Sequence, residues 1–369
     1  MEQRRKNLTQ LFIPICLETL LYMLSGMVDT LMLSSVNDQA VGAVGTANTY
    51  IGIFIIMFSV ISSGMVAVMT QNIGAGRPGV AYQARQLGLA FNAVLGVIMS
   101  LFLSLGAGTI LSGVGVADAL MQPAKTYLQI VGGFCILNAL IPICSSYLRA
   151  FGFSKEPLYA SIIGNVINFC LNAFFLFVLH KGVAGVATAT VISRIINLVI
   201  VVLLGAVLVK AKQHPERESN RAVMGQIIRI GLPSACETAI YNVSMTLVIR
   251  FLNQMDAQGL NVTARSYTMQ ITNFSYCVGA ALAQANAIMT GWHIGAKEYD
   301  ACDRGTKKAA VIGVIVAVIL ETVFTLCSGW IMQLFSKDPQ MVSLVGKLLA
   351  IDIVLEIGRV TNLVYGQAL

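Results

Sequence analysis

The chain alternates long apolar runs with short polar connections. Ten of the runs are long enough to cross about 30 Å of hydrocarbon at about 1.5 Å per residue. They predict membrane-spanning helices over residues 10–34, 46–70, 87–112, 124–148, 158–180, 184–209, 226–252, 265–291, 308–335 and 344–369. The longest connection is charged and follows the sixth run. It predicts an N-terminal bundle over 1–209, a cytoplasmic linker over 210–225 and a C-terminal bundle over 226–369.

Composition supports the same class of protein. Hydrophobic residues make up 56% of the 369 residues and charged residues 11%, which leaves too little polar surface to cover a soluble globule of this size. The fold class is therefore an all-α integral membrane protein. The start "MEQRRKNLTQ" is basic, as in a signal peptide, but the apolar run after it is too long for one and no small-residue cleavage site ends it. We expect the first helix to be retained.

The distribution of Lys and Arg predicts the orientation in the membrane. The N-terminal tail and the even-numbered connections, with their edges, contain Arg4, Arg5, Lys6, Arg77, Arg85, Arg149, Lys155, Lys210, Lys212, Arg217, Arg221, Arg229, Lys297, Arg304, Lys307 and Lys308. The odd-numbered connections and their edges contain only Lys125, Lys181, Lys337 and Lys347, together with Arg250 and Arg265 at helix ends. The positive-inside rule then predicts a cytoplasmic N-terminus in a cell membrane, of the bacterial inner-membrane type. The net charge of +7 follows from this topology and does not indicate nucleic acid.

An internal repeat relates the two halves. The segments "IPICLETLLYM" and "LPSACETAIYN" align at an offset of 219 residues. The identical pairs are Pro14 with Pro233, Glu18 with Glu237, Thr19 with Thr238 and Tyr22 with Tyr241. Residues 73–75 and 294–296 are also identical, at an offset of 221, and each triplet opens a basic connection. Six spans separate the copies, so both halves should have the same orientation.

The repeat also predicts what would follow the last residue. At the offset of 221, Leu148 matches Leu369, so the counterparts of spans 158–180 and 184–209 would lie beyond it. We therefore expect a second bundle with four of its six helices in this sequence. An incomplete sequence and a natural ten-helix variant both remain open. For a full-length protein we expect a monomer surrounded by membrane lipids.

Five segments carry a resemblance to a known family. They are "GMVDTLMLS", "MTQNIGAGR", "YLRAFGFSKEP", "GNVINFCLN" and "GLPSACE". In this order, and with the repeat, the chain resembles the multidrug and toxic compound extrusion (MATE) family over essentially its whole length. The resemblance implies two six-helix bundles around a central cavity and export of small organic cations in exchange for H⁺ or Na⁺. Wider relatives move lipid-linked saccharides, so a flippase for such lipids is the alternative function.

Asp29 is an acidic residue inside the first apolar run, with no cation near it in the sequence. A charged side chain at this depth is costly and usually functional, although an Asp that only braces its own helix is the structural alternative. The resemblance implies that Asp29 matches the helix-1 Asp implicated in proton or cation coupling. It also implies that Pro14 matches a helix-1 proline proposed as a hinge, since proline removes a backbone hydrogen bond.

Three asparagines in the fifth run are candidate partners of Asp29. Asn165, Asn168 and Asn172 are three and four residues apart and share one helical face. They predict a polar wall beside Asp29, with packing between helices as the alternative. In one branch of the family the position that matches Asn172 is Asp. The Asn found here argues against a proton site made of two carboxylates.

The second half also carries charges at membrane depth. Glu356 and Arg359 are three residues apart and predict an ion pair that lines the cavity or locks the tenth helix. Arg359 stands near the position of a Na⁺-binding Asp of another branch, so no C-terminal Na⁺ site is carried over and no metal site is predicted. The cavity-lining candidates are Glu18, Tyr22, Asn165, Glu237, Tyr241, Glu356 and Arg359.

These features predict secondary active export of small organic cations, driven by H⁺, or by Na⁺, through Asp29 with Asn168 and Asn172. A flippase would instead need a larger, strongly basic cavity. A membrane enzyme would need clustered catalytic groups, but the histidines His180, His214 and His293 lie at or beyond the membrane edges and form no recognised motif. We therefore expect a protein that is not an enzyme and needs no cofactor besides its coupling ion.

Overall fold

The computed structural model describes residues 6–34, 38–113, 116, 118–209, 216–255, 260–333 and 338–368. All regular elements in these ranges are helices. Several predicted features fall outside the described residues: Arg4, Arg5, Lys210, Lys212, His214, Lys337 and Leu369.

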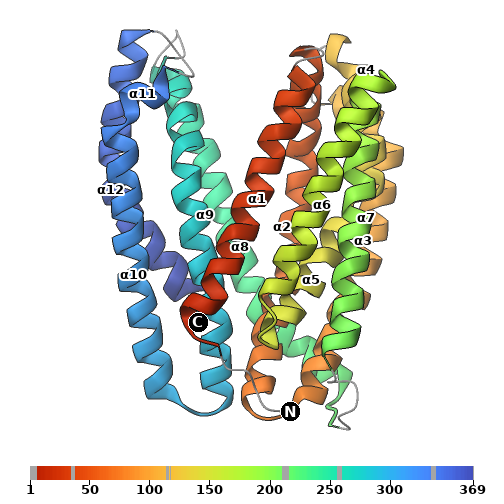
Figure 1. Ribbon diagram of the computed structural model, residues 1–369, viewed down its shortest axis with the longest axis vertical. Helices are drawn as coiled ribbons and strands as arrows, with labels where there is room; N and C mark the ends of the chain where they lie inside the picture. Colours follow the sequence, from red (N-terminus) through yellow and green to blue (C-terminus); the bar gives the residue numbers. More distant parts are fainter. Residues whose placement is uncertain are drawn as a thin grey trace. The chain divides into compact units, whose positions relative to one another are not determined.

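The helices follow one another along the chain with short connections (Figure 1). The first half contains α1 (Leu8–Ser34), α2 (Asp38–Gly74), α3 (Pro78–Gly113), α4 (Asp118–Tyr127), the π-helix η1 (Leu128–Gly132), α5 (Ile136–Ala150), α6 (Lys155–Ala173), the π-helix η2 (Phe174–Val178) and α7 (Gly182–Leu208). The second half contains α8 (Asn220–Met255), α9 (Leu260–Gly295), α10 (Tyr299–Leu326), α11 (Ser328–Met332) and α12 (Pro339–Gly366).

Each of the ten predicted runs falls on helical structure, but three differ in detail. The run 124–148 is divided into α4, η1 and α5, the run 158–180 ends in η2, and the run 308–335 is divided into α10 and α11. In addition, α8 begins at Asn220, inside the predicted linker. The Gln83 side chain hydrogen-bonds the Glu218 backbone and the Asn220 side chain, which fixes this start against α3.

The break before α5 allows a close helix contact. A Cβ at Gly96 of α3 would lie 2.9 Å from the Cα of Ile136, closer than side chains pack. The Ile136 backbone N–H donates to Ser100 Oγ at 3.0 Å instead of to its own helix. Gly96 leaves space for the backbone of Ile136, the first residue of α5, and the Ser100 hydroxyl one turn later accepts its N–H.

Length and composition identify fewer spans than ten. Five described helices are long and apolar enough to cross a membrane, or up to seven if each of two bent helix pairs is one span. Helices α8, α9 and α12 are as long, with 36, 36 and 28 residues. The apolar sequence of α12 contains four charged residues, Lys347, Asp352, Glu356 and Arg359. Charges in such a helix are costly in a membrane, which draws attention to them as functional groups.

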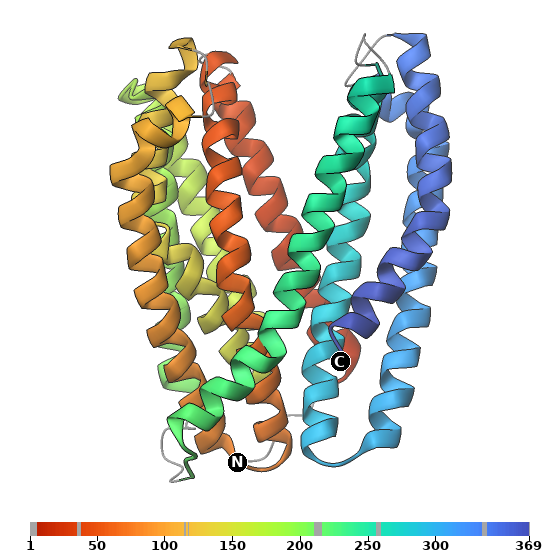
Figure 2. The same ribbon diagram turned by 180° about the vertical axis from the view of Figure 1, so that it is seen from behind.

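Contacts divide the chain into two compact units. Unit 1 comprises Met1–Lys6 and Leu21–Ala235, and unit 2 comprises Asn7–Leu20 and Cys236–Leu369, so α1 and α8 each contribute to both. In unit 1, α2 packs on α3, α4 and α5, and α6 packs on α7; in unit 2, α9, α10 and α12 pack on one another (Figures 1 and 2). The bundle boundaries at 1–209 and 226–369 stay a prediction.

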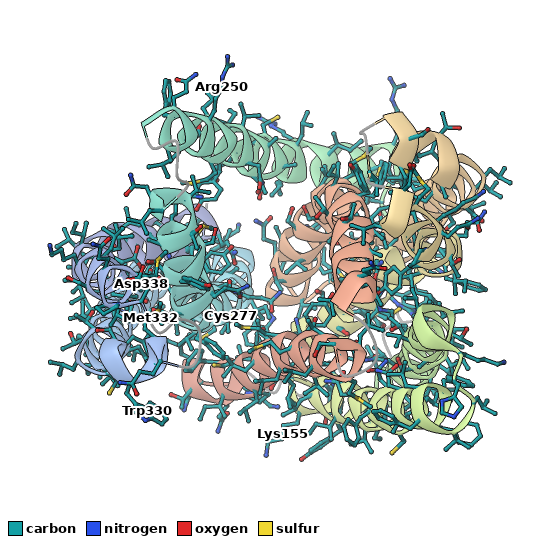
Figure 3. All side chains as sticks on the ribbon, turned by 90° about the horizontal axis from the view of Figure 1, so that it is seen from above. Lys155, Arg250, Cys277, Trp330, Met332 and Asp338 are labelled. Carbon is teal, nitrogen blue, oxygen red and sulfur yellow. The ribbon has the colours of Figure 1, made fainter. Side chains whose placement is uncertain are left out.

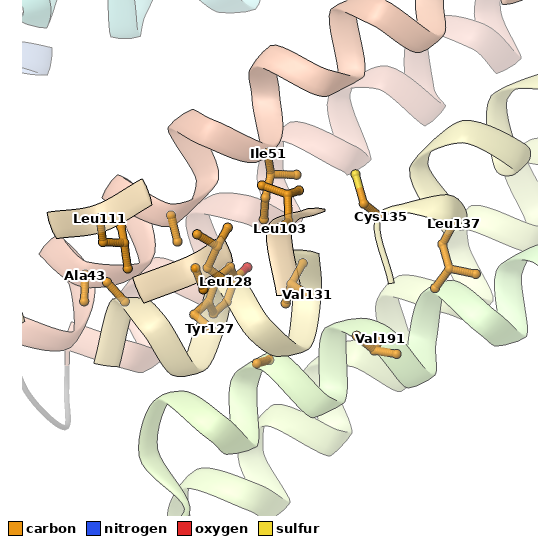
Figure 4. Close-up of a cluster of buried hydrophobic side chains, with 14 of the residues drawn as sticks. Ala43, Ile51, Leu103, Leu111, Tyr127, Leu128, Val131, Cys135, Leu137 and Val191 are labelled. Atoms are coloured by element: carbon orange, nitrogen blue, oxygen red, sulfur yellow. The ribbon is translucent and has the colours of Figure 1, made fainter. Parts of the chain in front are cut away.

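The interior of unit 1 is apolar and tightly packed. One cluster joins α2, α3, α4, η1, α5 and α7 and includes Ile51, Leu103, Tyr127, Leu128 and Val191 (Figure 4). Large apolar side chains also cover the outer faces of the helices. Leu105 is 83% exposed, Leu326 80% and Trp330, which points outward in Figure 3, 71%. Such faces suit lipid rather than water.

The repeat predicted from the sequence is present in the backbone. Helices α2 and α9 end at Gly74 and Gly295, and the next helices begin at Pro78 and Tyr299, in each case 221 residues apart. After α2, the N–H groups of residues 75, 76 and 77 bond the carbonyls of 71, 73 and 72. After α9, residues 296, 297 and 298 bond 292, 294 and 293 in the same pattern. Gly76 and Lys297 share the left-handed position, with φ of 73° and 62°.

Candidate functional site

The predicted polar face of α6 lies against α1 within unit 1. Asn172 Nδ2 donates to Asp29 Oδ1 at 2.6 Å and to Asn168 Oδ1 at 3.2 Å. One to two turns earlier on α6, Asn165 Nδ2 donates to the backbone oxygen of Leu21 at 3.4 Å. The three-and-four spacing therefore places Asn165 and Asn172 against α1, and Asn168 is bonded to Asn172 on the same face.

Burial makes this chain of amides sensitive to the charge of Asp29. Asn172 is fully buried, Asn168 is 5% exposed and Asp29 is partly buried. Within the described residues, Asn172 Oδ1 is a buried acceptor without a hydrogen-bond donor. A buried amide oxygen that lacks a donor costs about 1–3 kcal/mol. Asn172 Oδ1 can therefore accept a hydrogen bond from a further proton-bearing group.

Unit 1 also brings a cation to this site that the sequence reasoning missed. Arg194 of α7 attracts Asp29 electrostatically, and Tyr127 of α4 interacts with both charges. Arg194 Nη1 donates to Asn138 Oδ1 of α5 at 2.9 Å. No cation lies near Asp29 in the sequence, but the fold of unit 1 provides one from α7. The sequence did contain an indication of this partner, because Arg194 is the single Lys or Arg inside the apolar run 184–209.

The other first-half candidates occupy separate surroundings. Pro14 is buried inside α1, which continues without interruption from Leu8 to Ser34. One turn later, Thr19 Oγ1 donates to the carbonyl of Ile15 at 2.9 Å. Glu18 is partly buried and belongs to the segment of α1 in unit 2, whereas Tyr22 belongs to unit 1 and is 62% exposed. The roles of these residues remain predictions.

In unit 2, the charges of α12 form a row along one face. Arg359 Nη1 contacts Glu356 Oε1 at 2.9 Å, which is the ion pair expected from their spacing, and Arg359 Nη2 lies 3.5 Å from Asp352 Oδ1. Further along the row, Asn362 Nδ2 donates to Glu237 Oε1 of α8 at 3.1 Å. Tyr241, one turn after Glu237, is about half exposed.

Glu321 of α10 adds a third carboxylate to this part of unit 2. Glu321 and Glu356 are fully buried and Asp352 is 9% exposed. One carboxylate oxygen from each of the three lies within 4.8 Å of the others. Sequence spacing could not reveal this cluster, because Glu321 is on a different helix from Asp352 and Glu356.

The fold and these intramembrane polar groups define a multi-pass membrane transporter built from a repeated helical bundle. The family model MatE matches residues 14–174 and 233–369, so the chain belongs to the MatE family, whose members are transporters and not enzymes. It is 32% identical to the uncharacterized transporter YisQ of Bacillus subtilis over 95% of this chain and 78% of that protein. It is 23% identical to the probable multidrug resistance protein NorM of Thermotoga maritima, over 92% and 74%.

Solved structures show the same fold. A crystal structure of a MATE protein in the bent conformation superimposes with a TM-score of 0.87 at 18% identity, covering 98% of this chain and 81% of that one. An outward-facing multidrug resistance MATE family transporter of the MOP superfamily superimposes with a TM-score of 0.87 at 17% identity, covering 98% and 82%. The all-α fold class and the transporter class predicted from the sequence are confirmed.

Proposed function

We propose that this protein exports small organic cations by alternating access, in exchange for H⁺ that binds at Asp29. The observation that carries the proposal is the 2.6 Å hydrogen bond from Asn172 to Asp29 at the end of a buried amide row. Multidrug resistance proteins among its relatives support export of organic compounds. The acidic groups of unit 2, Glu237 among them, support a preference for cations.

The donor and acceptor pattern around Asp29 suits a group that changes its protonation state. An ionised carboxylate only accepts, and Asn172 Nδ2 supplies a donor to it. A protonated carboxyl group gains an O–H donor, and the unpaired Asn172 Oδ1 and the Asn168 amide offer acceptors on the same face. Both states can therefore be accommodated by small side-chain rearrangements, and Arg194 favours the ionised one.

The driving force is adequate for detoxification. One elementary charge moving through 100 mV gains about 2.3 kcal/mol. Because about 1.4 kcal/mol corresponds to a factor of ten, one H⁺ per substrate supports roughly fifty-fold accumulation when the exchange is otherwise neutral.

The proposed orientation places the N-terminus in the cytoplasm of a cell membrane, of the bacterial inner-membrane type. In unit 1, Lys6 Nζ lies 3.5 Å from Ser154 Oγ, and Arg77 pairs with Glu218 at 2.6 Å. The first contact joins Lys6 to the turn before α6, and the second joins the turn after α2 to the segment before α8. These segments belong to the basic connections, which supports a cytoplasmic location for them. We propose a monomer surrounded by lipid.

Flux measurements in proteoliposomes test this function. A fluorescent organic cation is followed while a pH gradient or a Na⁺ gradient is imposed separately. We expect transport with the pH gradient, and its loss in Asp29→Asn, which keeps size and hydrogen bonding but cannot titrate. The matched control is Asp118→Asn, at the exposed start of α4 in the same unit.

Three results would contradict the proposal. Normal pH-driven flux by Asp29→Asn, at equal protein level and with equal substrate binding, would exclude Asp29 as the H⁺ site. Flux driven by a Na⁺ gradient alone would show that Na⁺, and not H⁺, is the coupling ion. Transport of a lipid-linked saccharide, without transport of organic cations, would favour the flippase function.

A further inference from the structure

Three buried carboxylates of unit 2 lack sufficient countercharge. Glu321, Asp352 and Glu356 carry three negative charges when ionised, and Arg359 supplies one positive charge. The remainder is a charge of −2 inside a helical bundle, and an uncompensated buried charge is very costly. Either two protons or a bound cation must offset it.

Four buried carboxylate oxygens of this cluster are available to a ligand. Among the described residues, both oxygens of Glu321, Oδ2 of Asp352 and Oε2 of Glu356 are buried without a hydrogen-bond partner. Protons could neutralise two of the three carboxyl groups, whereas one divalent cation would offset the same charge and would use these oxygens as ligands.

A fourth polar group points to the same place. Ser275 of α9 is fully buried, and its Oγ has no hydrogen-bond partner of normal geometry among the described residues. It faces the carboxyl groups of both Glu321 and Glu356. Oxygens from three helices, α9, α10 and α12, therefore converge on one point.

The separation of the oxygens is compatible with an ion of the size of Ca²⁺. The three carboxylate oxygens lie within 4.8 Å of one another. Two ligands on opposite sides of Ca²⁺ are at most about 4.6–5.2 Å apart, since each lies about 2.3–2.6 Å from the ion. For Mg²⁺ the limit is about 4.2 Å, because its ligands lie about 2.0–2.1 Å away. The residual charge of −2 also matches a divalent cation.

We propose that Glu321, Asp352, Glu356 and Ser275 form a binding site for one divalent cation of the size of Ca²⁺, with Arg359 holding Glu356 and Asp352 in position. Asp352 and Glu356 are four residues apart and present their carboxylates on the same face of α12. Bound Ca²⁺ would join α9, α10 and α12. The site is separate from Asp29, which belongs to unit 1.

Ca²⁺ binding to the purified chain in detergent tests the site. We expect saturable binding of one Ca²⁺ per chain by calorimetry, and a rise in thermal unfolding temperature with Ca²⁺ concentration. Glu321→Gln, of nearly the same shape, should weaken Ca²⁺ binding at least about tenfold, as loss of a metal-site partner commonly does. The matched control is Asp303→Asn on the same helix, whose carboxylate is 60% exposed and paired with Lys307.

Ser275→Ala is the second variant, since it removes one ligand without changing the charge, and it should weaken Ca²⁺ binding while the chain stays folded. Asp29→Asn should bind Ca²⁺ normally, which separates this site from the proposed H⁺ site. Absence of saturable Ca²⁺ binding, or equal Ca²⁺ affinity in the parent chain and Glu321→Gln, would overturn the proposal. Stabilisation by Na⁺ but not by Ca²⁺ would also overturn it.

Discussion

At the scale of single residues, the contact between Asn172 and Asp29 is the most informative feature of unit 1. It joins a fully buried amide to a carboxylate at 2.6 Å, and the same nitrogen also reaches Asn168. A hydrogen bond to an ionised group is stronger than one between neutral groups. The hydrogen bond from Asn172 to Asp29 should therefore contribute to the stability of the protein in addition to the packing of α6 on α1.

A double-mutant cycle measures this relation. Asn172→Ala should destabilise the protein by about 0.6–1.7 kcal/mol, between the average and the largest value found for hydrogen bonds between membrane helices, with the charged partner favouring the upper end. In the Asp29→Ala background the same change should cost clearly less, because its acceptor is gone. Thermal or denaturant unfolding in detergent gives the four values. Asn165→Ala, which removes only a 3.4 Å contact with the Leu21 backbone, is the control and should show no coupling to Asp29.

Equal costs of Asn172→Ala in both backgrounds would show that Asn172 contributes packing alone. That outcome would remove the main observation behind a titrating site at Asp29, whereas a coupling confined to Asn172 would support it.

The polar row was predictable from the sequence, but its cation was not. Asn165, Asn168 and Asn172 share one face of a single helix, so their spacing alone defines the row. Arg194 lies on another helix, and its position beside Asp29 depends on how α7 packs in unit 1. Periodicity within one helix carries no information on that packing. Glu321 could not be grouped with Asp352 and Glu356 from the sequence either, because it approaches them only through the packing of α10 on α12.

At the scale of helices, α8 crosses α2 in unit 1 at a contact that only glycine permits. A Cβ at Gly231 would clash with the carbonyl oxygen of Val60, and a Cβ at Gly64 would clash with that of Ile227. The two backbones therefore touch directly, as small residues allow between membrane helices. The contact fixes the first turns of α8 against α2.

Gly231→Ala should separate these helices. Overpacking in a tight contact costs about 1–3 kcal/mol, and here the obstacle is backbone, which cannot rotate away. The matched control on the same helix is Gly225→Ala, where a Cβ has no atom within 4 Å. That change should stabilise α8 by about 1 kcal/mol, since alanine favours helices over glycine. Unfolding in detergent checks both, and a stabilising Gly231→Ala would show that the helices do not touch there.

Helix positions could be predicted well from the apolar runs, because a membrane requires long helices whatever their packing. The π-helices and the break between η1 and α5 could not. They depend on the approach of Ile136 to Gly96 and Ser100 of α3, which is a tertiary contact. The repeated turn after α2 and α9 was predictable only in part. The sequence shows the shared residues 73–75 and 294–296, but it does not show that Lys297 adopts the left-handed conformation of Gly76.

At the scale of the whole molecule, topology relates the basic residues to the direction of transport. Helix α6 and η2 together span Lys155–Val178, or 24 residues, about 36 Å at about 1.5 Å per residue. This length exceeds the hydrocarbon thickness of about 30 Å, so the two ends of the segment should reach opposite sides of the membrane. Lys155 begins α6, and Lys181 follows η2; both are exposed.

Cysteine labelling determines which end faces the cytoplasm. In a variant whose eight native cysteines are replaced, Lys155→Cys and Lys181→Cys are introduced one at a time. A membrane-impermeant maleimide added to intact cells should label Lys181→Cys and should reach Lys155→Cys only after the membrane is permeabilised, because the end with more Lys and Arg stays in the cytoplasm. Labelling after permeabilisation serves as the control for exposure in both variants. If intact cells label Lys155→Cys and not Lys181→Cys, the orientation is inverted, and the proposed direction of export must be inverted with it.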